Sequence, residues 1–259
     1  MQKPIFIGNW KMNKSGAEAC QYLERFAPAV TAAKLSDQAE IVLAVPYTLI
    51  ETMQRELTRH KATIALAAQN VHWLPSGAHT GEISAPMLKE FGVSHVLVGH
   101  SERRQFYGES DEGVFKRAEA CLGAGLIPII CIGETGDEYK RGISREVVSL
   151  QIKNGISKLP KPQVIQAIIA YEPVWAIGTG LSATPEIAAL MHSHIRSELN
   201  QVFGPTLGEQ IRVIYGGSAS RDNAQRLCNS PEIDGLLPGG ASLDADHFLD
   251  LIKAGIKKQ

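Results

Sequence analysis

The sequence is poor in features that mark several protein classes. Its 259 residues contain four cysteines, which lie far apart and show no Cys-X-X-Cys spacing: Cys20, Cys121, Cys131 and Cys228. This pattern argues against a disulfide framework or a zinc site and favours free thiols in a reducing compartment. We therefore expect a cytoplasmic protein that binds no metal.

Strong charge and long apolar runs are also missing. The net charge is −1 and basic and acidic residues are mixed along the chain, so no basic surface for nucleic acid or a membrane is expected. No apolar run approaches the roughly 20 residues that a membrane-spanning helix needs. Residues 1–10 lack the basic-then-apolar layout of a secretory signal. We expect neither nucleic acid nor a membrane as a partner.

Short apolar segments alternate along the chain with amphipathic ones. The predicted strands are Pro4–Asn9, Glu40–Ala44, Thr63–Gln69, His95–Gly99, Ile127–Ile132, Val164–Tyr171, Ile211–Tyr215 and Gly235–Leu237. The predicted helices are Ser15–Ala33, Thr48–Leu57, Ala85–Glu90, Asp111–Leu122, Arg141–Lys158, Pro185–Phe203, Arg221–Cys228 and Ala245–Lys257. Strand followed by helix predicts parallel pairing, because each crossover returns the chain to the same edge. Eight such units in about 250 residues fit an α/β protein built as one closed (β/α)₈ barrel over residues 1–259. An open doubly wound sheet is the alternative.

Polar and glycine residues follow the predicted strands, where barrels of this type carry their chemistry. These residues are Asn9 and Lys11 after the first strand, Gln69 and Asn70 after the third, His100 and Ser101 after the fourth, Glu172 after the sixth, Gly216-Gly217-Ser218 after the seventh, and Gly239-Gly240 after the eighth. Glycine pairs let backbone N–H groups approach a phosphate.

Glu172 stands out because it ends an apolar strand and precedes a stiff Pro173-Val174-Trp175 and a Gly-rich stretch. We name residues 173–183 the flap. A base on a rigid strand beside such a flap suits proton transfer that is shut away from water. Each residue also has an ordinary alternative: Lys11 as a solvated lysine, His100 as a helix cap, and the glycines as simple turns. That all of these ordinary roles fall together at corresponding strand ends is improbable.

Six segments together resemble the triosephosphate isomerase family, in its order and spacing, from the first strand to the last. They are Gly8-Asn9-Trp10-Lys11-Met12-Asn13, Ala68-Gln69-Asn70, Gly99-His100-Ser101-Glu102-Arg103-Arg104, Tyr171-Glu172-Pro173-Val174-Trp175-Ala176-Ile177-Gly178-Thr179-Gly180, Tyr215-Gly216-Gly217-Ser218 and Gly239-Gly240-Ala241-Ser242-Leu243.

The resemblance implies an aldose–ketose isomerase of glycolysis and gluconeogenesis that interconverts dihydroxyacetone phosphate and glyceraldehyde 3-phosphate through an enediol(ate). Glu172 would move the proton between adjacent carbons, and His100 would polarise the carbonyl as a neutral imidazole. Lys11 would supply a fixed positive charge, and Asn9 would help to orient the oxygen. Ser101 and Glu102 would support these groups.

The resemblance also implies how the phosphate is bound. Backbone groups of Gly178, Ser218, Gly239 and Gly240 would bind it, with no metal or organic cofactor. Closure of the flap would press Ile177 and Leu237 against Glu172 and exclude water. Cys131 would pack beside the site without reacting.

The segment from Val71 to Ile83, here named the dimer loop, is long for a barrel turn, and long loops are usually functional. The resemblance implies that its residues Thr80, Gly81 and Glu82 insert into a second subunit, with Thr80 near Asn9 and Glu102 of the partner subunit. A homodimer is therefore expected. His79 stands where the family usually has Phe or Tyr.

Pro238 is a second departure, since the family usually has valine there. Proline lacks an N–H and restricts the preceding residue. We hypothesise that Pro238 shifts Leu237 and weakens closure over Glu172. The alternative function is thus a phosphosugar-binding barrel with impaired turnover. An aldolase is a further rival, but it would need a Schiff-base lysine inside the barrel, and the apolar strands contain none.

Overall fold

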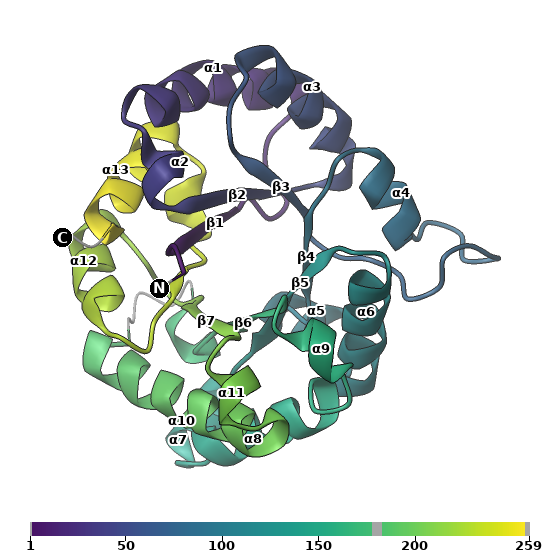
Figure 1. Ribbon diagram of the computed structural model, residues 1–259, viewed down its shortest axis with the longest axis vertical. Helices are drawn as coiled ribbons and strands as arrows, with labels where there is room; N and C mark the ends of the chain where they lie inside the picture. The colour runs from purple at the N-terminus through teal and green to yellow at the C-terminus, as the bar shows by residue number, and fades with distance from the viewer. Residues whose placement is uncertain (1, 178–182, 257–259) are drawn as a thin grey trace.

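The computed structural model describes residues 2–177 and 183–256 of the chain. Eight parallel strands close into a barrel in the order β1 to β8 (Figure 1). The strands are β1 (Ile5–Asn9), β2 (Glu40–Val45), β3 (Ala65–Ala68), β4 (His95–Val98), β5 (Ile127–Ile132), β6 (Ile168–Tyr171), β7 (Arg212–Tyr215) and β8 (Gly235–Leu236). β8 returns to β1, with Ile5 opposite Gly235 and Phe6 opposite Leu236. The predicted (β/α)₈ barrel is confirmed, and this closure rules out the open sheet.

Helices surround the barrel on all sides (Figure 1). They are α1 (Gly16–Ala32), α2 (Leu35–Gln38), α3 (Ile50–His60), α4 (Ala85–Glu90), α5 (Ser101–Tyr107), α6 (Asp111–Gly123), α7 (Gly136–Lys140), α8 (Ser144–Gly155), α9 (Lys161–Val164), α10 (Pro185–Phe203), α11 (Pro205–Gly208), α12 (Arg221–Asn229) and α13 (Ala245–Gly255). Single 3₁₀ turns occupy Tyr47–Leu49, Val174–Ala176 and Gly240–Ser242. Among the residues that the structure describes, no helix has both the length and the apolar character needed to cross a membrane.

Two of the predicted elements illustrate how boundaries differ from the structure. The predicted helix Arg141–Lys158 corresponds to α8, which is shorter at both ends, and the short helix α7 that precedes it is absent from the prediction; a capping box at Thr135 begins α7 and Gly142, at φ +72°, ends it. The predicted strand Val164–Tyr171 begins only at Ile168, since Pro162 in the first turn of α9 favours a helix there. Both differences lie away from the strand ends that carry Glu172 and Ile132.

Successive side chains of each strand point alternately into the barrel and outward to the helices, and this alternation gives two separate apolar cores. Ile5 and Ile7 of β1 belong to the cluster inside the barrel, which also contains Leu237, whereas Phe6 packs in the outer cluster between strands and helices.

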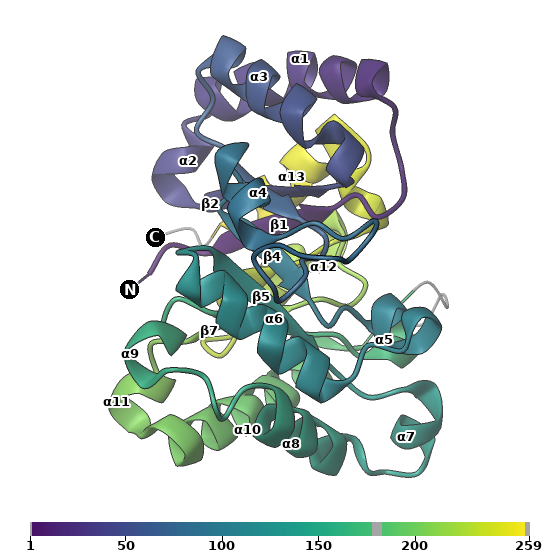
Figure 2. The same cartoon turned by 90° about the vertical axis from the view of Figure 1, so that its right-hand side faces the viewer.

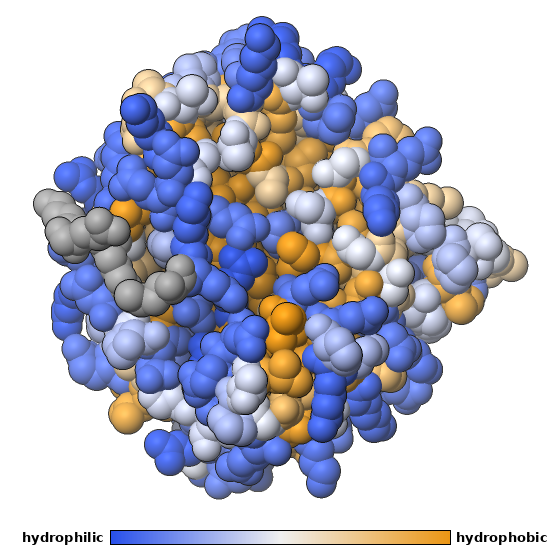
Figure 3. Space-filling model, viewed as in Figure 1, coloured by the Kyte–Doolittle hydropathy of each residue, from blue (hydrophilic) through white to orange (hydrophobic). Residues whose placement is uncertain are grey.

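Figure 2 shows the short helices that follow strands, α5 and α7, at one end of the barrel, and those that precede strands, α2, α9 and α11, at the other. The latter end presents mixed polar and apolar side chains to the viewer in Figure 3. Side chains placed just after the strands therefore meet at the α5–α7 end.

Candidate active site

The ends of three strands deliver the predicted polar side chains to one end of the barrel. Asn9 is the last residue of β1, His100 lies two residues beyond β4, and Glu172 directly follows β6. The strands of the closed barrel are all parallel, so these positions lie at the same, carboxyl end of the barrel. Asn9, His100 and Glu172 are 4%, 6% and 2% exposed, which is unusual for polar side chains and requires partners.

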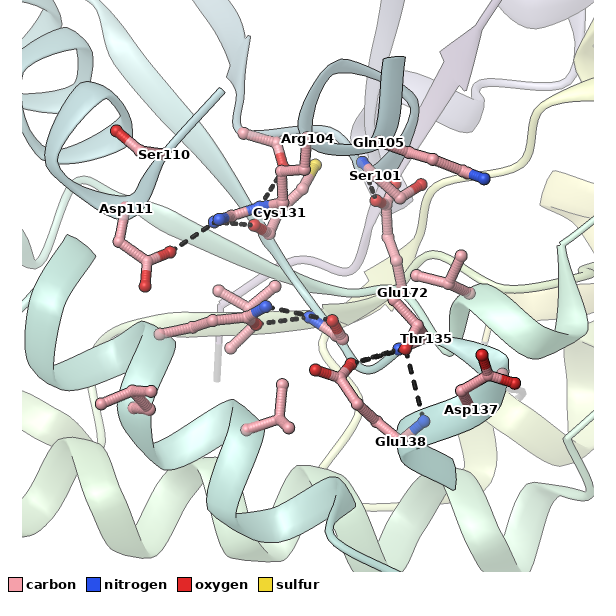
Figure 4. Close-up of a pocket in the computed structure, with 18 residues that line it drawn as sticks. Ser101, Arg104, Gln105, Ser110, Asp111, Cys131, Thr135, Asp137, Glu138 and Glu172 are labelled. Carbon is pink, nitrogen blue, oxygen red and sulfur yellow. Dashed lines mark hydrogen bonds and ion pairs between the residues drawn. The ribbon is translucent and has the colours of Figure 1, made fainter. Parts of the chain in front are cut away.

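The carboxylate of Glu172 makes two contacts with residues at the end of β4. Its Oε1 lies 3.1 Å from Nε2 of His100, and its Oε2 accepts a 2.9 Å hydrogen bond from the backbone N–H of Ser101. Figure 4 shows the side chain directed at Ser101. The backbone N–H of Glu172 donates to the carbonyl oxygen of Ile132 at 2.7 Å, which fixes the main chain of Glu172 against the end of β5. The side chains of Glu172 and His100 are therefore adjacent.

His100 caps α5, and this position determines its tautomer. Its Nδ1 accepts the N–H of Glu102 at 3.2 Å, so Nδ1 carries no proton. The proton then resides on Nε2, where it points to Glu172. The ring therefore serves as the cap that was its ordinary alternative and also presents Nε2–H to Glu172.

Lys11 adopts a left-handed conformation, with φ +51°, that is uncommon for lysine. Its N–H donates to Asn9 Oδ1 at 3.0 Å, and its carbonyl accepts from Gln69 Nε2 at 2.9 Å. The ammonium group lies 2.5 Å from Glu102 Oε1. A Cβ at Gly239 would lie 3.2 Å from Lys11 Cε, so glycine there lets the lysine chain approach the turn after β8. Asn9, Lys11 and Glu102 are therefore brought together.

The turns after β7 and β8 are neighbours, since Tyr215 pairs with Leu236. Ser218 Oγ donates to Ala176 O at 2.6 Å, which ties the first of these turns to the start of the flap. Gly240 opens a 3₁₀ turn in which Ser242 N–H donates to Gly239 O. The predicted phosphate donor Gly178 lies outside the described residues, as does Lys257 at the end of the last predicted helix.

Pro238 leaves the end of β8 regularly paired. Leu237 N–H donates to Tyr215 O at 2.8 Å, and Pro238 O accepts from Asn9 N–H at 2.9 Å. Leu237 is only 2% exposed and packs inside the barrel, whereas Ile177 is half-buried. The proline therefore bonds to the neighbouring strand through its carbonyl, the one backbone hydrogen-bonding group that it retains.

Cys131 is fully buried on β5. Burial, with a smaller contribution from the charge of Glu172, raises the pKa of its thiol well above the usual value. A thiol that stays protonated is a poor nucleophile.

Glu134 is a functional candidate that the sequence analysis missed. It is 1% exposed and accepts hydrogen bonds from the hydroxyl of Tyr171 at 3.1 Å and from Nε1 of Trp175 at 2.7 Å. Burial and the neighbouring Glu134 raise the pKa of Tyr171, which keeps it a neutral donor. Tyr139 stacks on Trp175 with ring centroids 4.0 Å apart. Glu134 follows β5 after one glycine, so the rule that identified the other strand-end residues also applies to it.

A cavity of about 750 Å³ lies behind the base, between β5 and the helices α5 to α8 (Figure 4). Glu172, Cys131, Gly133 and Gln151 contribute to its wall. Asn9, Lys11, Ser218 and Gly239 do not, so it is separate from the barrel mouth. In the parts of the chain that the structure describes, no three His, Cys, Asp or Glu side chains are grouped so as to hold a metal ion.

The dimer loop projects beyond the barrel beside α4 (Figure 1). Thr80, Gly81 and Glu82 of the loop are all exposed. The ring of His79 lies 4.3 Å from that of His72 in a tilted arrangement, and His72 in turn stacks on Trp73 at 4.4 Å. The loop is thus ordered by its own aromatic contacts.

The geometry agrees with comparisons against known proteins. The triosephosphate isomerase family model matches residues 4–255. The triosephosphate isomerase of Solibacter usitatus is 46% identical over 252 residues, covering 97% of this chain and 99% of that protein. That of Citrifermentans bemidjiense is 43% identical over 253 residues, covering 98% and 99%. The crystal structure of triosephosphate isomerase from Bartonella henselae superposes with a TM-score of 0.87 at 38% identity, covering 99% of this chain and 100% of that one. The chain belongs to the triosephosphate isomerase family.

Proposed function

We propose that this isomerase interconverts dihydroxyacetone phosphate and glyceraldehyde 3-phosphate by proton transfer through Glu172. The observation that carries the proposal is the 3.1 Å approach of the buried Glu172 carboxylate to the imidazole of His100. A carboxylate can remove a proton from the carbon next to a carbonyl, and the imidazole N–H can donate to that carbonyl oxygen. The enediol(ate) then collapses when Glu172 returns the proton to the neighbouring carbon.

Substrate binding must change the contacts that Glu172 makes in the unliganded site. Both oxygens of Glu172 are engaged, one with His100 and one with the amide of Ser101. The carboxylate therefore has to leave these partners to reach a substrate carbon. His100 Nε2–H, released from Glu172, is then free to donate to the substrate oxygen. The ammonium group of Lys11, beside Asn9, adds fixed positive charge where the oxyanion and the phosphate dianion bind.

Phosphate binding is assigned to the backbone groups of Ser218, Gly239 and Gly240, together with Gly178 of the flap. The adjacency of the turns after β7 and β8 supports this, because two glycine-rich turns present N–H groups to one anion. Binding energy from this non-reacting group can drive closure of the flap over the reacting carbons. Ile177 and Leu237 would then exclude water from Glu172, and no cofactor takes part.

We also propose that the chain acts as one cytoplasmic domain that forms a homodimer. The exposed dimer loop supports this, since Leu74 is 41% exposed at its base. Other large apolar side chains that are well exposed include Met12 at 95% and Tyr107 at 71%. A second subunit that receives Thr80, Gly81 and Glu82 near its own Asn9 and Glu102 would cover such surface.

A coupled assay with glyceraldehyde 3-phosphate tests the activity. Glu172→Gln should lower kcat by about 10²–10⁴-fold, because the amide cannot act as a base. Glu119→Gln, at an exposed position on α6, is the matched control and should keep wild-type kcat. Wild-type protein without isomerase activity would overturn the proposal, and unchanged kcat in Glu172→Gln would overturn the role of this base.

A further inference from the structure

The side chain of Gln151 makes hydrogen bonds to both backbone polar groups of a single residue, Gly133. Gln151 is half-buried on α8, and its Oε1 accepts the N–H of Gly133 at 2.8 Å. Its Nε2 donates to the carbonyl oxygen of the same Gly133 at 3.1 Å. A side-chain amide carries both a donor and an acceptor, so it can match the N–H and the carbonyl of one residue in this way. The position of Gly133 is therefore defined by a helix that contributes nothing else to the site.

Gly133 lies directly against the main chain of the base. A Cβ at this position would be 1.8 Å from the carbonyl oxygen of Glu172 and 2.6 Å from its carbonyl carbon. On the other side of the same contact, Glu172 N–H donates to Ile132 O at 2.7 Å. Residues 132 and 133 thus contact the peptide groups on both sides of the Glu172 Cα, and any shift of Gly133 is passed to the carboxylate.

The next residue connects the same segment to the flap. Glu134 accepts Val174 N–H through its carbonyl at 3.1 Å, and Trp175 Nε1–H through its side chain at 2.7 Å. Holding Gly133 therefore positions the first turn of the flap as well as the base.

Packing alone does not hold this segment. Gly133 and Gln151 both line the cavity of about 750 Å³ behind Glu172, so the segment has open space on that side. Atoms that face such a space have no neighbours on that side with which to make van der Waals contacts. On that side, the two hydrogen bonds from Gln151 restrain Gly133.

We propose that Gln151 is a positioning residue, which acts through Gly133 to hold Glu172 and the start of the flap in the geometry needed for proton transfer. The inference rests on the proposed isomerase function. Gln151 does not touch the substrate, and the phosphate-binding turns lie on β7 and β8, so its loss should slow turnover without weakening substrate binding.

Gln151→Leu removes both hydrogen bonds while keeping most of the side-chain volume. We expect kcat to fall about tenfold, because a misplacement well under 1 Å already slows a positioned reaction. KM should stay within about twofold and the thermal midpoint within a few degrees. Asn154→Leu, an exposed amide on the same helix, is the matched control and should change neither constant.

Gln151→Glu separates positioning from a general structural role. Its carboxylate can accept the N–H of Gly133 but repels the carbonyl, whereas the protonated acid can again accept and donate. The ratio of its kcat to that of the wild type should therefore rise as pH falls from 8 to 5, while the ratio for Gln151→Leu stays flat. If Gln151→Leu fails to fold, this pH-dependent rescue carries the test alone.

Amide hydrogen exchange gives a readout that needs no activity. Exchange at Gly133 and Glu172 should quicken in Gln151→Leu and not in Asn154→Leu. An inactive wild type overturns the proposed function, whereas these exchange rates still decide whether Gln151 holds the segment. Wild-type kcat in Gln151→Leu, equal losses in kcat and substrate affinity, a flat pH ratio for Gln151→Glu or unchanged exchange would each overturn the inference.

Discussion

A single methyl group at Gly133 should disable this site. The Cβ of Gly133→Ala would lie 1.8 Å from the carbonyl oxygen of Glu172, a distance that no real contact of this type tolerates. The obstructing atoms belong to the backbone, so no side chain can rotate aside. Either Glu172 or the connection from β5 to α7 must move by roughly 1 Å or more before the methyl group fits.

The displacement has two measurable consequences. Misplacing a catalytic group by about 1 Å costs on the order of 10²-fold in rate, so kcat should fall by that factor. Overpacking costs about 1–3 kcal/mol in the free energy of unfolding, which lowers the thermal midpoint by about 3–10 °C in a chain of this size. Steady-state kinetics and calorimetry on the same preparation measure both.

Gly136→Ala is the matched control, three residues along the same connection. Its Cβ would be 3.8 Å from the Cβ of Trp175, an ordinary van der Waals distance. It should keep wild-type kcat and thermal midpoint. Gly133→Ala with the kinetics and midpoint of the wild type would refute the contact between Gly133 and the main chain of Glu172.

Three further outcomes are expected elsewhere in the molecule. His95 and Arg212 lower the pKa of Glu40 to about 2 from 4.5, so this carboxylate stabilises the fold above about pH 4.5 and the stabilisation is lost as pH falls through about 2. The shift corresponds to at most about 3 kcal/mol, and solvent screening of a side chain 34% exposed reduces it to about 1–2 kcal/mol. Denaturant unfolding of Glu40→Gln should show that deficit at pH 7 and a shrinking one toward pH 2; a deficit independent of pH contradicts the charge network. Pro238→Val should raise kcat/KM if the proline weakens closure, and equal values in the coupled assay would remove that hypothesis. Leu74→Asp should shift the chain to monomer in sedimentation at micromolar concentration, because a charge at the base of the dimer loop opposes burial; an unchanged sedimentation coefficient would contradict the proposed interface.

The barrel and its strand-end residues were predictable because they depend on local patterns. Alternating apolar and amphipathic segments fix parallel pairing, and parallel pairing places the residue after each strand at one end. The same rule predicts that Asn9, His100 and Glu172 lie together. The start of β6 was predicted too early because the apolar run hides a short helix that Pro162 initiates.

Other features depend on contacts between segments that no local pattern connects. Gln151 lies on a helix, where an amide side chain ordinarily faces solvent, and only the return of α8 against β5 brings it to Gly133. The tautomer of His100 likewise follows from one backbone N–H in α5. The strand-end rule could have identified Glu134, but nothing in the sequence indicates that Tyr171 and Trp175 both donate hydrogen bonds to it.

The position of Glu172 is determined from three directions, and this explains why a strand end can carry a base. Ile132 O fixes its amide, Gly133 limits its carbonyl, and the N–H of Ser101 holds its carboxylate. The first two restraints act on the main chain and persist whatever the side chain does. The third acts on the carboxylate alone and, in the proposed reaction, must be released for proton transfer. Substitutions that disturb the main-chain restraints should therefore lower kcat, whereas replacing the side chain of Ser101 by alanine leaves its backbone N–H in place and should preserve this restraint.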